Sequence, residues 1–229
     1  MNITSLALGI ATLAFTASTS ADALSLAQEE SRTAGDSAPI VIEETSPWYF
    51  HAAGGGNMML NSDFENVDHT MKFGPGVAVD LGVGYSLNKI FAVQVQTGVA
   101  WNKIDSIDGA DLSGGEGNVY QVPLTLHLVM GFPISDSWKL GFSAGGGIQW
   151  TNFDGSGRTN GSTAYSYSSQ SYAFRYQLGV AATRAIAHNM TLGFGVRFSG
   201  TTSLDIGYNG EKVKGLTNIG LGATFKLTF

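Results

Sequence analysis

The chain of 229 residues contains no cysteine, only five prolines and little charge. Without cysteine there can be no disulfide framework, no thiolate metal site and no cysteine nucleophile. Charged residues make up 13% of the chain, about half the share found in an ordinary soluble domain. The net charge of -6 argues against the clustered basic surface that nucleic-acid binding requires. We therefore expect no nucleic-acid partner.

Long apolar runs are also missing, whereas glycine and hydrophobic residues are abundant. No run reaches the 18 or so residues that a transmembrane helix needs. The chain nevertheless has 31 glycines and is 43% hydrophobic and 11% aromatic, which argues against disorder. A membrane β-barrel stays possible, because each of its strands carries a much weaker hydropathy signal than a helix does.

The N-terminal region has the features of a secretory signal. Leu6–Phe15 is an apolar run, and the small residues around Ala21 and Ala23 form an A-x-A cleavage pattern. We predict a signal peptide over residues 1–23, cleaved after Ala23 or Ala21; the alternative is a mobile tail. Residues 24–46 are acidic, rich in serine and alanine and without period, so they are expected to form a flexible periplasmic linker.

Apolar residues alternate with small or polar ones along the remainder of the chain. A period of two predicts strands rather than helices. The pattern is clearest at the C-terminal end and least regular in the first segment, where Gly54–Gly56 interrupt it. It predicts eight antiparallel strands in an up-and-down meander, at about residues 48–59, 77–85, 91–101, 121–132, 138–150, 174–183, 190–199 and 217–229.

The connections between these strands alternate between long and short. Outer-membrane barrels have this arrangement, with short periplasmic turns and longer extracellular loops. The short connections are expected at residues 88–89, 135–137 and 188–189, and the long ones at about 60–72, 102–117, 151–171 and 202–214.

The composition of the two faces of the strands indicates whether each face contacts water, lipid or the barrel interior. A soluble lipocalin-like barrel would turn its apolar face inward and coat its outside with charge. Here the less apolar face consists mostly of glycine, alanine, threonine, serine and glutamine, with few charges. Such residues suit a crowded lumen, so we expect the apolar face to contact lipid.

The four tryptophans support this interpretation, because all of them stand at predicted strand ends. Trp48 and Trp138 begin strands, and Trp101 and Trp150 end them. Trp138 and Trp150 share one face, and the strand between them spans about 40 Å. A tilt of about 40° reduces this to about 30 Å along the membrane normal, which places both rings at the interfaces that tryptophan prefers.

At the C-terminal end, the apolar residues Phe225, Leu227 and Phe229 alternate with polar ones, and the last residue is aromatic. With the eight-strand pattern over about residues 47–229, this end resembles the small eight-stranded outer-membrane β-barrel family, which includes the OmpA transmembrane domain, OmpX and opacity-like porin family proteins. The resemblance implies a monomeric transmembrane β-barrel in the outer membrane of a Gram-negative bacterium. It also implies contact with membrane lipid and lipopolysaccharide, and with periplasmic chaperones and the barrel assembly machinery during biogenesis. The peptidoglycan binding of OmpA is not carried over, because it belongs to a further domain.

The predicted lumen carries more basic than acidic side chains. The strands supply four bases and one acid, and we propose that loop acids such as Asp205 or Glu211 neutralise Arg175 and Arg197. The lumen is then either a hydrogen-bonded plug or an anion-preferring solute path. The expected polar network comprises Asp80, His127, Lys139, Arg175, Arg197 and Lys226.

No catalytic, cofactor or metal site is predicted. His127 and Ser143 could lie near each other in the lumen, but a lipid substrate would have to enter a narrow, filled interior. Acids in two long loops, Asp63 to Asp68 and Asp105 to Glu116, could bind divalent cations or bridge lipopolysaccharide through them. Solvated side chains explain these acids more simply.

The sequence predicts a structural or surface-interaction role through four long extracellular loops. The 151–171 loop, with Tyr165, Tyr167 and many serines, is the best candidate for recognition. The alternatives are a narrow channel for small solutes and, in a different class, a soluble periplasmic lipocalin-like ligand carrier.

Overall fold

A computed structural model describes residues 46–65, 70–107, 110–111, 117–135, 137–158, 164–205 and 212–229. All of them belong to one compact unit, Thr45–Phe229. The predicted signal peptide and all but the last residue of the predicted linker lie outside the described residues. Within the described ranges there is no helix long and apolar enough to cross a membrane.

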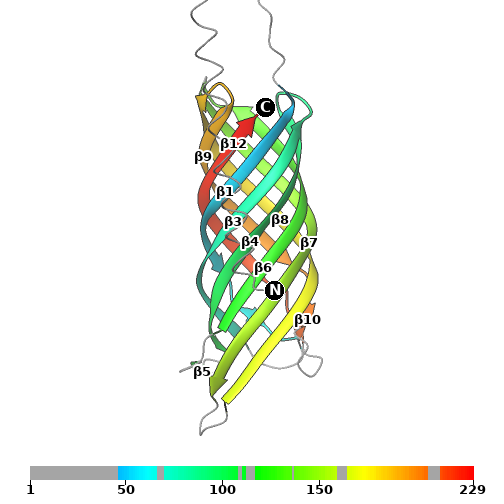
Figure 1. Ribbon diagram of the computed structural model, residues 1–229, viewed down its shortest axis with the longest axis vertical. Helices are drawn as coiled ribbons and strands as arrows, with labels where there is room; N and C mark the ends of the chain where they lie inside the picture. Colours follow the sequence, from blue (N-terminus) through cyan, green and yellow to red (C-terminus); the bar gives the residue numbers. More distant parts are fainter. Residues whose placement is uncertain are drawn as a thin grey trace, which may run out of the picture. The chain divides into compact units, whose positions relative to one another are not determined.

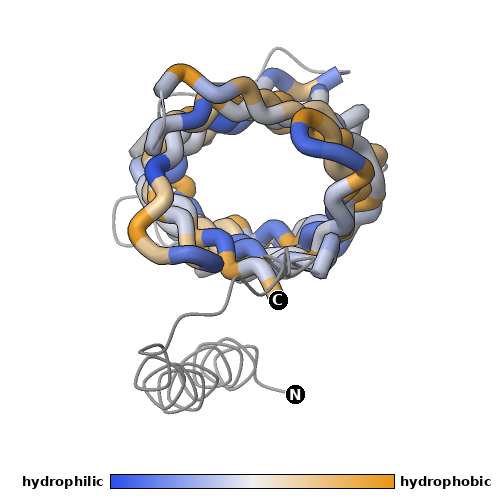
Figure 2. Tube along the Cα trace, turned by 90° about the horizontal axis from the view of Figure 1, so that it is seen from above, coloured by the Kyte–Doolittle hydropathy of each residue, from blue (hydrophilic) through white to orange (hydrophobic). Residues whose placement is uncertain are grey.

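Eight long strands form a closed antiparallel barrel in the described part of the chain (Figure 1). Each pairs with the next long strand, and the first pairs with the last, so the ring seen down the axis is continuous (Figure 2). The predicted eight-stranded fold is therefore confirmed. The long strands are β1 (Trp48–Met59), β3 (Thr70–Ser86), β4 (Phe91–Ile107), β6 (Gly117–Pro133), β7 (Trp138–Arg158), β8 (Ala164–Ala187), β9 (Met190–Thr201) and β12 (Thr217–Thr228).

The two ends of the barrel differ in their connections. At one end, called the turn end here, lie the start of β1, the end of β12 and the short connections 87–90, 134–137 and 188–189. The opposite end, called the loop end, carries the four longer connections. It also carries the short strands β2 (Ser62–Asp63), β5 (Ala110–Asp111), β10 (Leu204–Asp205) and β11 (Lys212–Val213). The turn end is at the top of Figure 1.

Successive side chains along each strand point alternately out of the barrel and into its lumen. The outward set is apolar and exposed; Phe194, for example, is 73% exposed. The inward set is polar and buried, with Gln121, Gln149 and Ser199 fully inaccessible. In water this arrangement would expose a continuous apolar belt, whereas in a bilayer lipid covers it. The apolar face therefore points outward as predicted, and the lipocalin-like arrangement with reversed faces is not observed.

Several strands extend further toward the loop end than the sequence predicts. The predicted 151–171 loop is mostly β-hairpin, because β7 and β8 stay paired from Thr151 and Ser171 out to Arg158 and Ala164. From Trp150 the extension of β7 adds about 26 Å of strand at the usual rise per residue. The glycines and serines here look like a loop in the sequence, but ladder hydrogen bonds between backbone groups hold them in strands.

Glycine creates the space that large lumen side chains occupy. The Gly54–Gly56 run does not interrupt β1, which pairs continuously with both neighbours. A Cβ atom on Gly84 would collide with the Tyr49 ring, and one on Gly145 would collide with the His127 ring. Each of these large side chains therefore lies across a glycine of a neighbouring strand.

One interruption of the ladder follows from proline. The pairing of β4 with β6 runs from Phe91–Met130 to Thr97–Leu124 and resumes at Ala100–Gln121. Between them stands Pro123, which has no backbone N–H to donate. The Thr97 hydroxyl donates instead to the Pro123 carbonyl at 2.8 Å. The wall is thus closed at this position by a side-chain hydrogen bond.

Candidate functional site

The loop end of the barrel is covered by its own connections. The segment between β9 and β12 folds back, and the Thr201 amide donates to the Leu216 carbonyl at 3.0 Å. It also pairs with the β1–β3 connection: the Glu65 amide donates to the Lys212 carbonyl and the Lys214 amide to the Asp63 carbonyl, both at 2.8 Å. Residues 62–65 and 202–216, as far as they are described, are called the loop-end cap.

Beneath the loop-end cap lies a cluster of buried apolar side chains, the apolar plug. Leu204, Val213 and Leu216 of the cap are fully inaccessible, and so is Val119 of the barrel wall. Cap and wall residues pack in one continuous cluster at this end of the lumen. The plug consists of Met59, Phe64, Met71, Ile104, Val119, Phe153, Ala173, Leu204, Val213 and Leu216.

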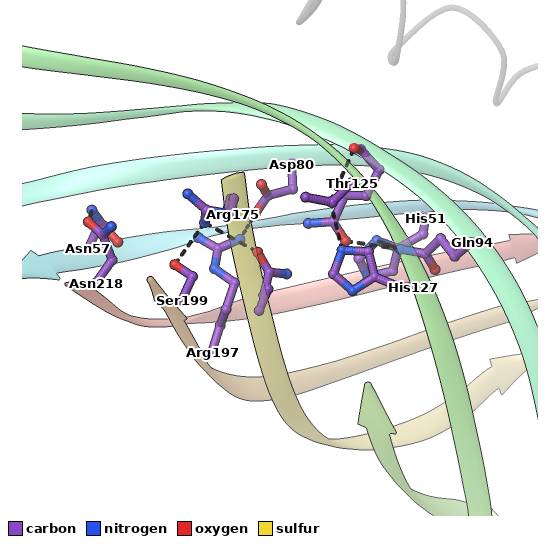
Figure 3. Close-up of polar contacts among 12 residues, drawn as sticks. His51, Asn57, Asp80, Gln94, Thr125, His127, Arg175, Arg197, Ser199 and Asn218 are labelled. Atoms are coloured by element: carbon purple, nitrogen blue, oxygen red, sulfur yellow. Dashed lines mark hydrogen bonds and ion pairs between the residues drawn. The ribbon is translucent and has the colours of Figure 1, made fainter. Parts of the chain in front are cut away.

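Next to the plug, buried amides cross the lumen. The Asn57 amide donates to Asn102 at 2.6 Å and to Asn218 at 3.0 Å. Asn218 in turn donates to Gln121 at 3.2 Å, and Asn102 donates to the Gly74 carbonyl at 3.0 Å. These residues come from β12, β1, β3, β4 and β6, so the hydrogen bonds link strands on different sides of the barrel. Asn57 and Asn218 are labelled in Figure 3.

Arg175 of β8 is buried beside this amide group. Its guanidinium donates to Ser199 at 2.8 Å, to Gln177 at 3.2 Å and to Gln149. Among the described residues Arg175 has no carboxylate partner, so its charge is solvated by neutral oxygens. The predicted neutralisation of Arg175 by a loop acid is therefore not observed in the described part of the chain.

Arg197 of β9 forms an ion pair with Asp80 of β3 across the lumen (Figure 3). Both side chains are largely buried, at 18% and 5% exposure. The prediction that a loop acid neutralises Arg197 is wrong: the one acid on the predicted inner faces does so. Asp205 instead lies in β10 with an exposed side chain, and its backbone amide donates a hydrogen bond to the Ser171 hydroxyl at 3.1 Å. Glu211 lies outside the described residues.

Closer to the turn end, two histidines line the lumen. His127 lies 2.7 Å from the Thr125 hydroxyl, and His51 lies 3.3 Å from the Gln94 amide. Within the described ranges His127 makes no hydrogen bond to Ser143, so the nucleophile and base considered from sequence are not joined. No three histidine or acidic side chains of the described part gather closely enough to hold a metal ion.

Between the ion pair and the turn end lies a cavity of about 280 Å³, which opens at the turn end. Asp80 and Arg197 stand at its inner end, and Lys89 lines it from the β3–β4 turn. Lys139 and Lys226 of the predicted network also line this cavity rather than the hydrogen-bonded centre. Lys139 is exposed at the mouth, whereas Lys226 is half-buried with its ammonium 3.8 Å from the Tyr49 ring centroid.

The four tryptophans stand on the outer surface, but only Trp48 and Trp138 lie at strand ends. The strands β4 and β7 continue past Trp101 and Trp150 to Ile107 and Arg158, so the prediction that these two tryptophans end their strands is wrong. Trp48 and Trp138 lie at the turn end, where Trp48 meets Tyr85 edge to face with centroids 5.0 Å apart. Trp101 and Trp150 lie opposite Tyr120 and Tyr172 on their neighbouring strands, nearer the loop end.

The predicted assembly signal occupies the last strand. Phe225 and Leu227 lie opposite Ala52 and Phe50 of β1, at the seam where the barrel closes. Phe229 is exposed, and its amide donates to the Trp48 carbonyl at 3.2 Å.

The loop acids divide between described and undescribed residues. Asp63 accepts a hydrogen bond from Thr70 at 2.9 Å and lies 3.6 Å from the Lys214 ammonium, and Glu65 contacts Ser203. These contacts tie the loop-end cap together. Most of the other acids considered from sequence, among them Asp68 and Glu116, lie outside the described residues.

Sequence reasoning missed the amide group and the apolar plug as functional units. The alternation in the sequence places Gln121, Gln149, Gln177 and Asn218 on the inner face, but their partners depend on how far neighbouring strands are shifted. Asn57 and Asn102 fall in the irregular first strand and in a predicted loop. The sequence signal that could have indicated the amide group is the number of asparagine and glutamine residues on the inner face, which increases toward the loop end.

Comparison with known proteins agrees with this architecture. Residues 10–226 match the family model described as outer membrane protein beta-barrel domain. No curated protein matches the chain. The crystal structure of Neisserial surface protein A is similar at 15% identity with a TM-score of 0.51, over 82% of this chain and 100% of that one.

Two further solved structures are more distant. OprG from Pseudomonas aeruginosa shares 17% identity over 80% of this chain and 97% of that one, with a TM-score of 0.47. Ail, the attachment invasion locus protein of Yersinia pestis, shares 16% identity over 78% of this chain and 98% of that one, with a TM-score of 0.43. Because the family match spans nearly the whole chain, the protein belongs to the outer membrane protein β-barrel domain family.

Proposed function

We propose that the protein is a closed, non-conducting barrel that anchors four hairpins at the cell surface for structural or surface-interaction roles. The observation that carries this proposal is the apolar plug, whose wall and cap residues fill the loop end. A barrel sealed by packed apolar side chains gives ions and solutes no hydrated path. Its rigid wall holds the protruding β7–β8 hairpin well clear of the lipid belt.

The orientation in the membrane belongs to this proposal. Family members place short turns in the periplasm and long connections outside. By this rule the loop-end cap and the β7–β8 hairpin face the medium, and the turn-end cavity faces the periplasm. Lipopolysaccharide then surrounds the loop end, and the exposed hairpins provide contact surfaces for other molecules.

Cysteine labelling tests the orientation directly, because the chain contains no cysteine. We expect Asp154→Cys, exposed on the β7 extension, to react in intact cells with a PEG-maleimide too large to cross the outer membrane. Lys89→Cys, in the β3–β4 turn, serves as the matched control and should react only after the cells are permeabilised. Labelling of Lys89→Cys alone in intact cells would mean that the barrel is inserted the other way.

A narrow channel is the competing function for the same fold. Purified protein in a planar bilayer should give no discrete conductance steps, because the plug and the hydrogen-bonded centre leave no continuous aqueous path. Steps of uniform size, whose number rises with the amount of protein inserted and which disappear when insertion is blocked, would refute the closed barrel. The Phe153→Ala variant described in the Discussion provides the comparison in which the plug is weakened.

Biogenesis completes the proposal. Residues 1–23 are proposed as a signal peptide, so N-terminal sequencing of the membrane-extracted protein should begin at Leu24, or at Asp22 if cleavage follows Ala21; a sequence beginning at Met1 would disprove cleavage. The terminal alternation of Phe225, Leu227 and Phe229 is proposed to be recognised by the barrel assembly machinery after delivery by periplasmic chaperones.

We propose that the protein is a monomer. We also propose that it has no catalytic activity, since in the described part His127 bonds to Thr125 and not to a nucleophile paired with an acid.

A further inference from the structure

The turn-end cavity has an unbalanced charge. Its described lining contains four cationic side chains, Lys89, Lys139, Arg197 and Lys226, and a single carboxylate, Asp80. Asp80 is committed to the ion pair with Arg197. The three lysines therefore face the cavity without an acidic partner among the lining residues that the structure describes.

Lys226 is held at a defined place on the cavity wall. Its ammonium lies over the face of Tyr49, 3.8 Å from the centroid, a geometry in which the ring attracts the cation. Tyr49 is fixed in turn, because its hydroxyl donates to Gln94 at 3.1 Å and its ring lies across Gly84. The charge of Lys226 is thus positioned before any ligand arrives, which reduces the entropy lost on binding.

Lys139 approaches the same cavity from a different part of the wall. It lies on β7, whereas Lys226 lies on β12, and β8 and β9 separate the two strands. Hydroxyl groups of Ser143, Thr183 and Thr191 also line the cavity. Separate cationic groups interspersed with neutral donors form a concave surface that can surround an anion on several sides.

We propose that the turn-end cavity is a binding site for a small soluble anion with two or more negative charges, of the polyphosphate or polycarboxylate type. Cations that share a confined space with low-dielectric walls repel each other, and a multivalent anion removes that repulsion. The volume of about 280 Å³ limits the ligand to a small molecule. This site lies at the opposite end from the surface hairpins and does not depend on their role.

The test measures binding of pyrophosphate, and separately of citrate, to the full-length mature barrel in nanodiscs of phosphatidylcholine. This lipid has no net charge, so anionic headgroups do not compete. We expect saturable binding of at least one probe, with amide shifts in the NMR spectrum at Thr183 and Thr191. The double variant Lys139→Gln/Lys226→Gln should weaken binding by about a hundredfold or more, since each of the two charged hydrogen bonds that it removes accounts for about tenfold or more.

The matched control is Lys72→Gln/Lys103→Gln, which removes the same charge from exposed positions toward the loop end. It should bind the probes as the parent protein does. Heat-modifiable gel mobility establishes that both double variants are folded, and Lys226→Arg tests whether a retained charge retains binding. Absence of binding by both probes, an equal loss in the control, or shifts confined to the loop end would overturn the proposal.

Discussion

Replacing Arg197 by methionine should lower the free energy of unfolding by about 3 kcal/mol, the lower end of the range for breaking a buried ion pair. The substitution keeps much of the side-chain volume but leaves the carboxylate of Asp80 inside the lumen without its partner. The lower end applies because the pair borders the turn-end cavity. Equilibrium urea unfolding of the barrel in lipid vesicles measures the change.

The control for this result is an exposed ion pair of the same chain. Lys214 and Asp63 lie 3.6 Å apart with exposures of 60% and 58%, so Lys214→Met should cost less than about 1 kcal/mol. In the double variant Asp80→Asn/Arg197→Met the unpaired charge is gone, and much of the lost stability should return. A cost for Arg197→Met no larger than that for Lys214→Met would show that the lumen pair is effectively solvated.

The barrel could be read from the sequence because lipid and lumen impose opposite chemistry on alternate residues. Along β12, Ile219 and Leu221 are exposed outward while Asn218 is buried inward, and this period of two is visible without coordinates. The strand ends could not be read in the same way. Beyond Trp150 the sequence loses the apolar–polar alternation that identifies a strand, although the pairing of β7 with β8 continues to Arg158 and Ala164.

The contacts inside the lumen were less predictable for a geometric reason. Asp80 and Arg197 could both be assigned to the inner face, but whether they meet depends on the shift between strands around the ring. The register that joins β3, β1, β12 and β9 brings them together. Loop acids appeared to be the better partners only because sequence does not record this shift.

The apolar plug was hidden for a different reason. Phe64, Leu204 and Leu216 are isolated apolar residues in polar connections, where sequence offers no period to compare. Their burial arises only because the β9–β12 connection folds over the barrel and pairs with the β1–β3 connection. The same chain thus closes one end with apolar side chains and leaves cationic ones around the other. The low overall charge hides this asymmetry.

Replacing Phe153 by alanine should destabilise the barrel by about 3–5 kcal/mol, the range for removing a buried aromatic side chain from a core. Phe153 is 1% exposed and packs within the apolar plug, between wall and cap residues. Phe153 packs in one cluster with cap residues, so a hole beneath the cap should also loosen the seal locally. Urea unfolding measures the global cost, and a reporter cysteine measures the local opening.

The reporter is Thr151→Cys, an inward and fully buried position two residues before Phe153 on β7. With Phe153 intact, a small charged thiol reagent should modify this cysteine slowly; with Phe153→Ala the rate should rise at least about tenfold. Phe153→Leu is the control, because it keeps most of the volume and should cost less than about 1.5 kcal/mol with little change in rate. Equal reactivity in all three backgrounds would mean that the plug does not seal the loop end, and the closed-barrel proposal would lose its main support.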